Sequence, residues 1–112
     1  MGKEKRKETR FELIKSLRVL DQETGRFVGL LLDITMQGML LGSGEPLPIN
    51  KDFHLWIEIV TEKVVVDVYS LWSSKDDKRN FYKTGFRFVN LTPKTNMNIK
   101  SLIEVLKVRV DD

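Results

Sequence analysis

The sequence predicts a mainly β domain, a small closed antiparallel barrel followed by one C-terminal α-helix. Three observations support this fold class. Short runs rich in valine, leucine and aromatic residues show an apolar side chain at every second position. Turn-forming residues separate these runs, so about six or seven strands follow one another as hairpins. Near the C-terminus the apolar period changes to three and four. The pattern alone leaves a sandwich open, but so few strands favour a barrel whose open end the helix covers.

The chain opens with a polar, charged segment that has no periodicity. Residues 1–12 are therefore expected to form a flexible basic arm, and residues 13–112 the single barrel domain. Residues Ser73–Asn80 are expected to form a solvated loop, because they contain no apolar side chain. The expected strands are Leu13–Leu20, Arg26–Ile34, Met39–Gly42, Phe53–Ile59, Val64–Trp72 and Phe81–Val89.

The C-terminal helix is predicted over about residues 93–110. Thr92 is a suitable N-cap, and Pro93 suits the first helical position. The apolar residues that follow recur at helical spacing and form one stripe. These are Ile99, Leu102, Ile103, Leu106 and Val110.

Composition narrows the class of partner. The chain has 112 residues with 41% hydrophobic and 31% charged side chains, which is the ordinary range for one globular domain. The 19 basic and 16 acidic residues give a net charge of only +3, so no DNA partner is expected. No apolar run approaches the roughly 20 residues of a membrane span, and no secretory signal is visible. We therefore expect a cytoplasmic domain without a membrane segment, as a monomer or weak dimer.

No residues with the pattern of a catalytic or metal site occur. The chain has no cysteine and one histidine, His54, which cannot build an ordinary zinc site alone. No glycine-rich phosphate loop or dinucleotide fingerprint is present. The sequence therefore predicts neither an enzyme nor a metal or cofactor site.

Two motifs instead predict a binding site for an anion and a base. The bend from Asp33 to Gly38 places a carboxylate, the Thr35 hydroxyl and a glycine between two apolar runs. A carboxylate can accept the N–H donors of guanine's Watson–Crick edge, and glycine lets a ligand approach the backbone. Arg6 and Arg10 are four residues apart and suit bidentate binding of phosphate. Together they fit a guanine nucleotide.

On these residues the chain resembles the PilZ domain family of receptors for cyclic di-GMP. The family carries an RxxxR motif followed by [D/N]xSxxG, and the strand segments Val68–Trp72 and Gly85–Phe88 resemble its later barrel strands. The resemblance implies a six-stranded barrel with a C-terminal helix. It assigns ligand binding to Arg6, Arg10, Asp33, Thr35 and Gly38, where Thr35 replaces the usual serine.

Two further positions are suggested by the resemblance. Lys5 stands where many members carry an arginine, and it keeps the charge without the planar guanidinium. Trp72 matches a position that lies beside a guanine in some relatives, although a barrel aromatic would explain it equally well. The resulting hypothesis is a cyclic di-GMP receptor whose arm reorganises towards an unidentified downstream protein.

Two alternatives remain open. One is a degenerate PilZ-like adaptor that binds proteins but no nucleotide. The other is a small barrel for single-stranded nucleic acid, which needs exposed aromatic side chains among basic ones. Trp56 is the only sequence feature that suggests it.

Overall fold

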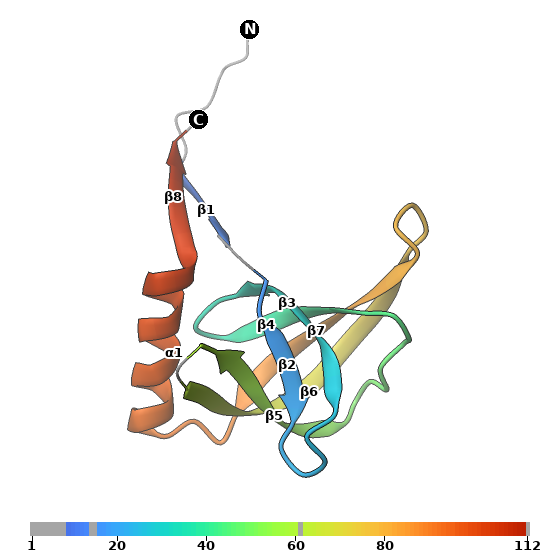
Figure 1. The fold of residues 1–112 in the computed structure, drawn as a ribbon, viewed down its shortest axis with the longest axis horizontal. Coiled ribbons are helices and arrows are strands. Elements are labelled where there is room, and N and C mark those ends of the chain that lie inside the picture. The colour runs from blue at the N-terminus through green and yellow to red at the C-terminus, as the bar shows by residue number, and fades with distance from the viewer. Residues whose placement is uncertain (1–8, 14–15, 61, 112) are drawn as a thin grey trace, which may run out of the picture.

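A closed six-stranded antiparallel barrel with one C-terminal helix forms the body of the molecule (Figure 1). The computed structural model describes the backbone of residues 9–13, 16–60 and 62–111, and the side chains of residues 16–60 and 62–107. The strands follow the order β2-β3-β4-β7-β6-β5, and β5 pairs with β2 to close the barrel. The predicted fold class is confirmed. The barrel strands are β2 (Arg18–Asp21), β3 (Phe27–Ile34), β4 (Gly38–Ser43), β5 (Asp52–Ile59), β6 (Glu62–Asp76) and β7 (Phe81–Val89).

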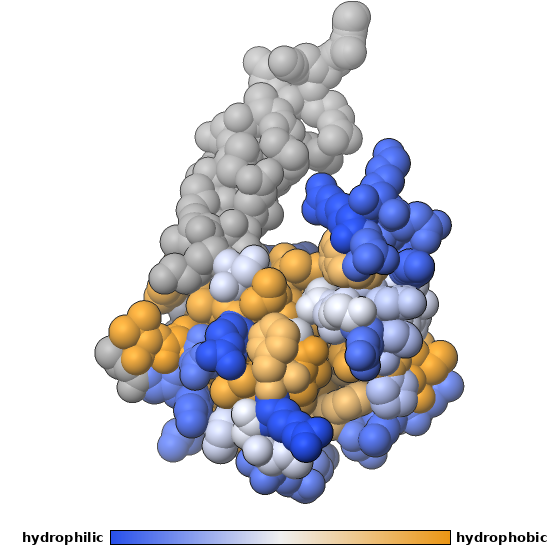
Figure 2. Space-filling model, turned by 45° about the vertical axis from the view of Figure 1, so that its right-hand side comes forward, coloured by the Kyte–Doolittle hydropathy of each residue, from blue (hydrophilic) through white to orange (hydrophobic). Residues whose placement is uncertain are grey.

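The core fills the barrel with the side chains that the period of two turns inward. In β5, Leu55 and Ile57 are fully buried, whereas His54, which precedes Leu55, points outward and is exposed. Hydrophobic side chains also reach the outer surface in scattered patches between charged ones (Figure 2). Among the described residues, the fully buried hydrophobic ones are Val19, Leu31, Ile34, Leu41, Leu55, Ile57, Val66, Val68 and Ile99.

The hairpin of β6 and β7 is longer than the sequence suggested. Ser73–Asn80 was expected to be a loop, but β6 continues to Asp76, which pairs with Phe81. Backbone pairing does not require apolar side chains, so polar residues extend the strands beyond the barrel (Figure 1). The turn is stabilised by the Asp76 carboxylate, which accepts the backbone N–H groups of Lys78 and Arg79 at 3.1 and 3.2 Å.

Helix α1 (Pro93–Leu106) starts as predicted. The Thr92 hydroxyl accepts the N–H of Thr95 at 3.1 Å, and Pro93 occupies the first turn. Its buried residues Ile99, Leu102 and Leu106 join the barrel core. In the part of the chain that the structure describes, no helix is both long and apolar enough to cross a bilayer.

The helix ends at Leu106, before the expected end near residue 110, and the chain continues as β8 (Lys107–Asp111). Val108 and Val110 alternate with charged residues there, a pattern that suits a strand better than a helix. β8 pairs antiparallel with β1 (Thr9–Leu13), forming a two-stranded ribbon that projects from the barrel (Figure 1). Part of the segment expected to be a flexible arm is therefore a strand.

An ion pair on the outer face gives the first testable prediction. The His54 Nδ1 atom lies 2.7 Å from Asp67 Oδ1, and this hydrogen bond raises the pKa of His54 above 6.5, with Asp52 and Glu23 acting in the same direction. Because the pKa is higher in the folded chain, the pair stabilises the fold below pH 6.5, and this contribution is lost as pH rises through the folded value. Asp67→Asn should lower the pKa of His54 in an NMR titration, whereas Asp77→Asn should leave it unchanged.

Candidate functional site

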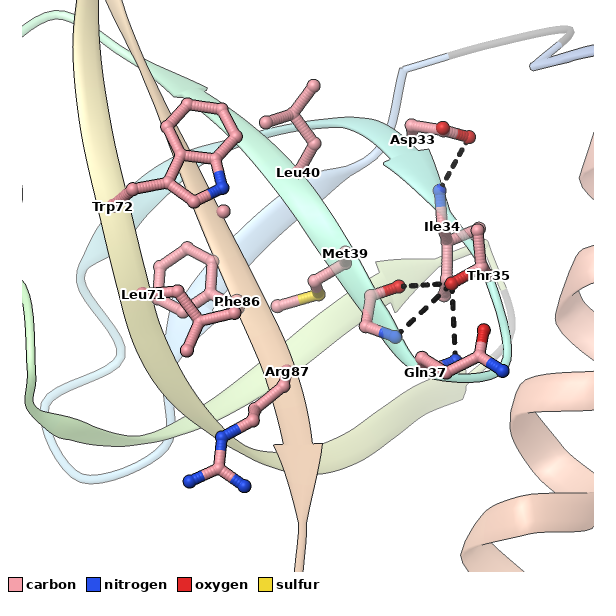
Figure 3. A pocket seen from close by; sticks show the side chains of 12 residues that line it. Asp33, Ile34, Thr35, Gln37, Met39, Leu40, Leu71, Trp72, Phe86 and Arg87 are labelled. Atoms are coloured by element: carbon pink, nitrogen blue, oxygen red, sulfur yellow. Dashed lines mark hydrogen bonds between the residues drawn. The ribbon is translucent and has the colours of Figure 1, made fainter.

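The bend between β3 and β4 is held by its own threonine. The Thr35 hydroxyl accepts the backbone N–H groups of Gln37 at 3.2 Å and Gly38 at 3.3 Å (Figure 3). The Thr35 N–H also donates to the Gly38 carbonyl at 2.8 Å. Hydroxyl bonding of this kind is typical of turns. Thr35 therefore shapes the bend in the structure.

Asp33 reaches the outer face through a β-bulge. The register of β3 against β4 shifts between Leu31 and Asp33, because Leu31 pairs with Leu41 and Asp33 pairs with Leu40. Without the extra residue, strict alternation would turn Asp33 to the same side as the buried Leu31. The bulge leaves the Asp33 side chain 54% exposed while Ile34 is buried in the core.

A second bulge does the same for Trp72. The register of β6 against β7 shifts between Ser70 and Trp72, so that Trp72 pairs with Gly85 and is 46% exposed, whereas Ser70 is fully buried. A Cβ atom at Gly85 would overlap the indole ring, so the glycine allows Trp72 to lie flat on the strand.

The two bulges place Asp33 and Trp72 on one row across four neighbouring strands. Asp33 pairs with Leu40, Leu40 pairs with Gly85, and Gly85 pairs with Trp72. Three strand spacings separate the two ends of the row by about 14 Å. Figure 3 shows Leu40 between them, and the residues line a shallow hollow of about 340 Å³. A carboxylate thus faces an aromatic ring across an apolar floor.

Gly38 packs closely against β7. A Cβ atom at this position would overlap the carbonyl oxygen of Phe86, a backbone atom that cannot move aside easily. The sequence interpretation gave this glycine a role in ligand approach. The structure adds a packing reason for it that holds without any ligand.

Arg87 lines the same hollow and was missed as a site residue. It pairs with Gly38 on one side and with Tyr69 on the other, and its guanidinium lies 5.1 Å from the centroid of the Tyr69 ring. No acidic side chain among the described residues forms an ion pair with it. The alternation of Phe81–Val89 could have identified it, since Arg87 shares the outer face with Gly85.

The arginines of the RxxxR motif are placed only in part. Lys5 and Arg6 lie outside the described residues. The backbone of Arg10 lies in β1 and pairs with Val110 of β8, but its side chain is outside the described set. The structure therefore brings Asp33, Thr35, Gly38 and Trp72 together without testing the contribution of the arm.

Trp56, the residue that suggested the nucleic-acid alternative, already contacts a lysine. The Lys63 ammonium lies 4.1 Å from the centroid of the Trp56 ring. The bases of a single strand stack on free aromatic faces, and this cation covers one of them.

In the described part of the chain, no group of three potential metal-ligating side chains is present.

The closed six-stranded barrel with one C-terminal helix places the protein in the class of small β-barrel domains. The model of the PilZ domain family matches residues 4–105, so the chain belongs to this family. PilZ domains are ligand-binding receptor or adaptor domains rather than enzymes.

Two solved structures resemble the fold. The PilZ domain of YcgR from Escherichia coli, solved with c-di-GMP, has a TM-score of 0.67 at 16% identity, over 91% of this chain and 92% of that chain. The Bacillus subtilis inhibitor of motility MotI/DgrA has a TM-score of 0.68 at 14% identity, over 90% of this chain. This chain spans only 50% of MotI/DgrA. No curated protein matches the sequence significantly.

Proposed function

We propose that this PilZ domain is a receptor for cyclic di-GMP in the bacterial cytoplasm. The observation that carries the proposal is the row from Asp33 to Trp72, because two separate bulges turn these side chains to one face. Asp33 would accept the N1–H and N2–H donors of one guanine. Trp72 would stack on a base above the small surface of Gly85, where the glycine leaves the indole flat and partly exposed.

The arm would supply the phosphate contacts. Arg6 and Arg10 would bind the phosphates in bidentate fashion, with Lys5 adding a less directional charge. Arg87, stacked on Tyr69 and without an acidic partner among the described side chains, would offer one more cation at the edge of the hollow. The fit to the YcgR domain supports the same ligand, since that domain was solved with c-di-GMP.

The signal would be passed on by the arm. Several charge-assisted hydrogen bonds at roughly 1.5–3 kcal/mol each must exceed the cost of rearranging the arm, on the order of 1 kcal/mol for each residue that changes conformation. The balance is consistent with binding near the micromolar level, about −8 kcal/mol. An arm closed over the ligand would present a new surface to a downstream protein, which the chain would meet as a monomer or weak dimer.

Isothermal titration of cyclic di-GMP into the folded domain tests the proposal. Cyclic di-AMP is the matched control, because it carries the same phosphates but an adenine edge that lacks the paired N–H donors. We expect heat with cyclic di-GMP and none with cyclic di-AMP. If cyclic di-GMP also gave no heat at high micromolar concentration, the result would favour the adaptor alternative. In that case Asp33 and Thr35 serve only the contacts observed within the chain.

Arg10→Ala should weaken cyclic di-GMP binding at least tenfold. The reason is the loss of a charge-assisted bidentate contact, which contributes about 2 kcal/mol. Arg26→Ala is the control, because Arg26 is an exposed arginine beside the β2–β3 turn and its loss changes the net charge equally. Equal affinities for the two variants would remove the arm from the site.

A further inference from the structure

Lys107 forms an ion pair with one oxygen of the Asp33 carboxylate in this structure. Its Nζ atom lies 3.2 Å from Asp33 Oδ1. The lysine side chain is only 14% exposed, whereas that of Asp33 is 54% exposed. The contact joins β3 of the barrel to the residue that ends the C-terminal helix, and none of the sequence motifs includes Lys107.

The geometry of this contact conflicts with pairing to guanine. Asp33 Oδ1 also accepts the backbone N–H of Ile34 at 2.8 Å (Figure 3). With the Lys107 ammonium, this oxygen already has two donors. The Watson–Crick edge of guanine presents two parallel N–H groups, which require both oxygens of one carboxylate. A base can therefore pair fully with Asp33 only after the Lys107 ammonium has left Oδ1 or the carboxylate has turned.

Lys107 stands where three parts of the C-terminal region meet. It is the C-cap of α1, and its backbone N–H donates to the carbonyl of Ile103. It is also the first residue of β8, where it pairs with Leu13 of β1. A shift of Lys107 thus acts on the last turn of the helix and on the root of the ribbon that carries Arg10.

We infer that the Asp33–Lys107 ion pair is a latch that closes the guanine site in the unliganded domain and couples its opening to the C-terminal helix. The inference rests on the proposed function and adds its regulation. When guanine binds, its N–H groups replace the Lys107 ammonium as the donors to Asp33, so the ammonium must move into water. The helix end and the β1–β8 ribbon then respond to occupancy of a site on the barrel.

The first test is titration of cyclic di-GMP into Lys107→Met, which keeps most of the aliphatic stem and removes the charge. Loss of a cation alone would weaken binding of an anionic ligand. The latch predicts the opposite, an affinity about two- to fivefold higher, since that is what an ion pair of partly exposed groups contributes. Lys100→Met, an exposed lysine on α1, is the matched control and should not raise the affinity.

The second test uses the unmodified protein, so it does not depend on the folding of a variant. Saturation with cyclic di-GMP should speed amide hydrogen exchange at Lys107, whose N–H bond to Ile103 closes the helix. Slower or unchanged exchange would overturn the coupling, and equal or weaker binding by Lys107→Met would overturn the latch. If neither the wild type nor Lys107→Met binds, the receptor proposal fails instead.

Discussion

Asp33→Ala should weaken cyclic di-GMP binding about a hundredfold. Two charge-assisted hydrogen bonds to one guanine, each contributing about 1.5 kcal/mol, are lost together. The fold should be little affected, because the side chain is 54% exposed and water can reach the N–H of Ile34 in its place. Isothermal titration measures the change in affinity, and a thermal melt checks the fold.

The change in net charge acts in the opposite direction to the weaker binding expected for Asp33→Ala. Removal of any carboxylate raises the net charge above +3 and should favour an anionic ligand slightly. Asp77→Ala measures this charge effect alone, because Asp77 is exposed at the tip of the β6–β7 hairpin and far from the row that joins Asp33 to Trp72. Asp33→Ala also breaks the ion pair with Lys107, so Lys107→Met gives the size of that separate effect. Binding by Asp33→Ala within threefold of Asp77→Ala would exclude Asp33 as the guanine acceptor.

Gly38→Ala should lower the free energy of unfolding by about 3 kcal/mol, near the upper end of overpacking effects. The added methyl group would overlap the Phe86 carbonyl oxygen, which belongs to the backbone of the neighbouring strand. Relief of the overlap requires β4 and β7 to separate beside the pairs Gly38–Arg87 and Met39–Phe86. Urea denaturation followed by circular dichroism measures the change.

Gly44→Ala is the matched control, because a Cβ atom there meets no heavy atom within 4 Å. Both substitutions reduce the conformational freedom of the unfolded chain equally, so the difference between them isolates the packing term. Gly44→Ala should stay within about 0.5 kcal/mol of the wild type. If Gly38→Ala were equally stable, the close contact with β7 would not hold in solution.

The elements that could be predicted from the sequence are those governed by local patterns. Alternation in Phe53–Ile59 identified its buried face, and Thr92 with Pro93 identified the start of the helix. Several elements differed from the expected ranges. The expected strand Leu13–Leu20 is not continuous, because Leu13 ends β1 and the barrel strand β2 covers Arg18–Asp21. The β6–β7 hairpin extends through polar residues because backbone pairing does not depend on hydropathy, and Val108 and Val110 continue the chain as a strand.

The part of the candidate site whose residues lie close together in the sequence could be predicted. Asp33, Thr35 and Gly38 do lie together in one bend, and their spacing alone made that a reasonable prediction. Their role as ligands stays a prediction, as do those of Lys5, Arg6, Arg10 and Trp72. Arg87 was missed, because an arginine on the outer face of a strand is usually an ordinary surface charge.

The sequence by itself determined the mainly β class with one C-terminal helix, the apolar faces of the strands, the capped helix start and the two motifs, since each depends on neighbours along the chain. Only the tertiary structure decided which side chains share a surface. Strict alternation would turn Asp33 and Trp72 towards the core, and two register shifts between paired strands bring them out. The contact of Lys107 with Asp33 likewise joins residues 74 positions apart, and no local pattern encodes it.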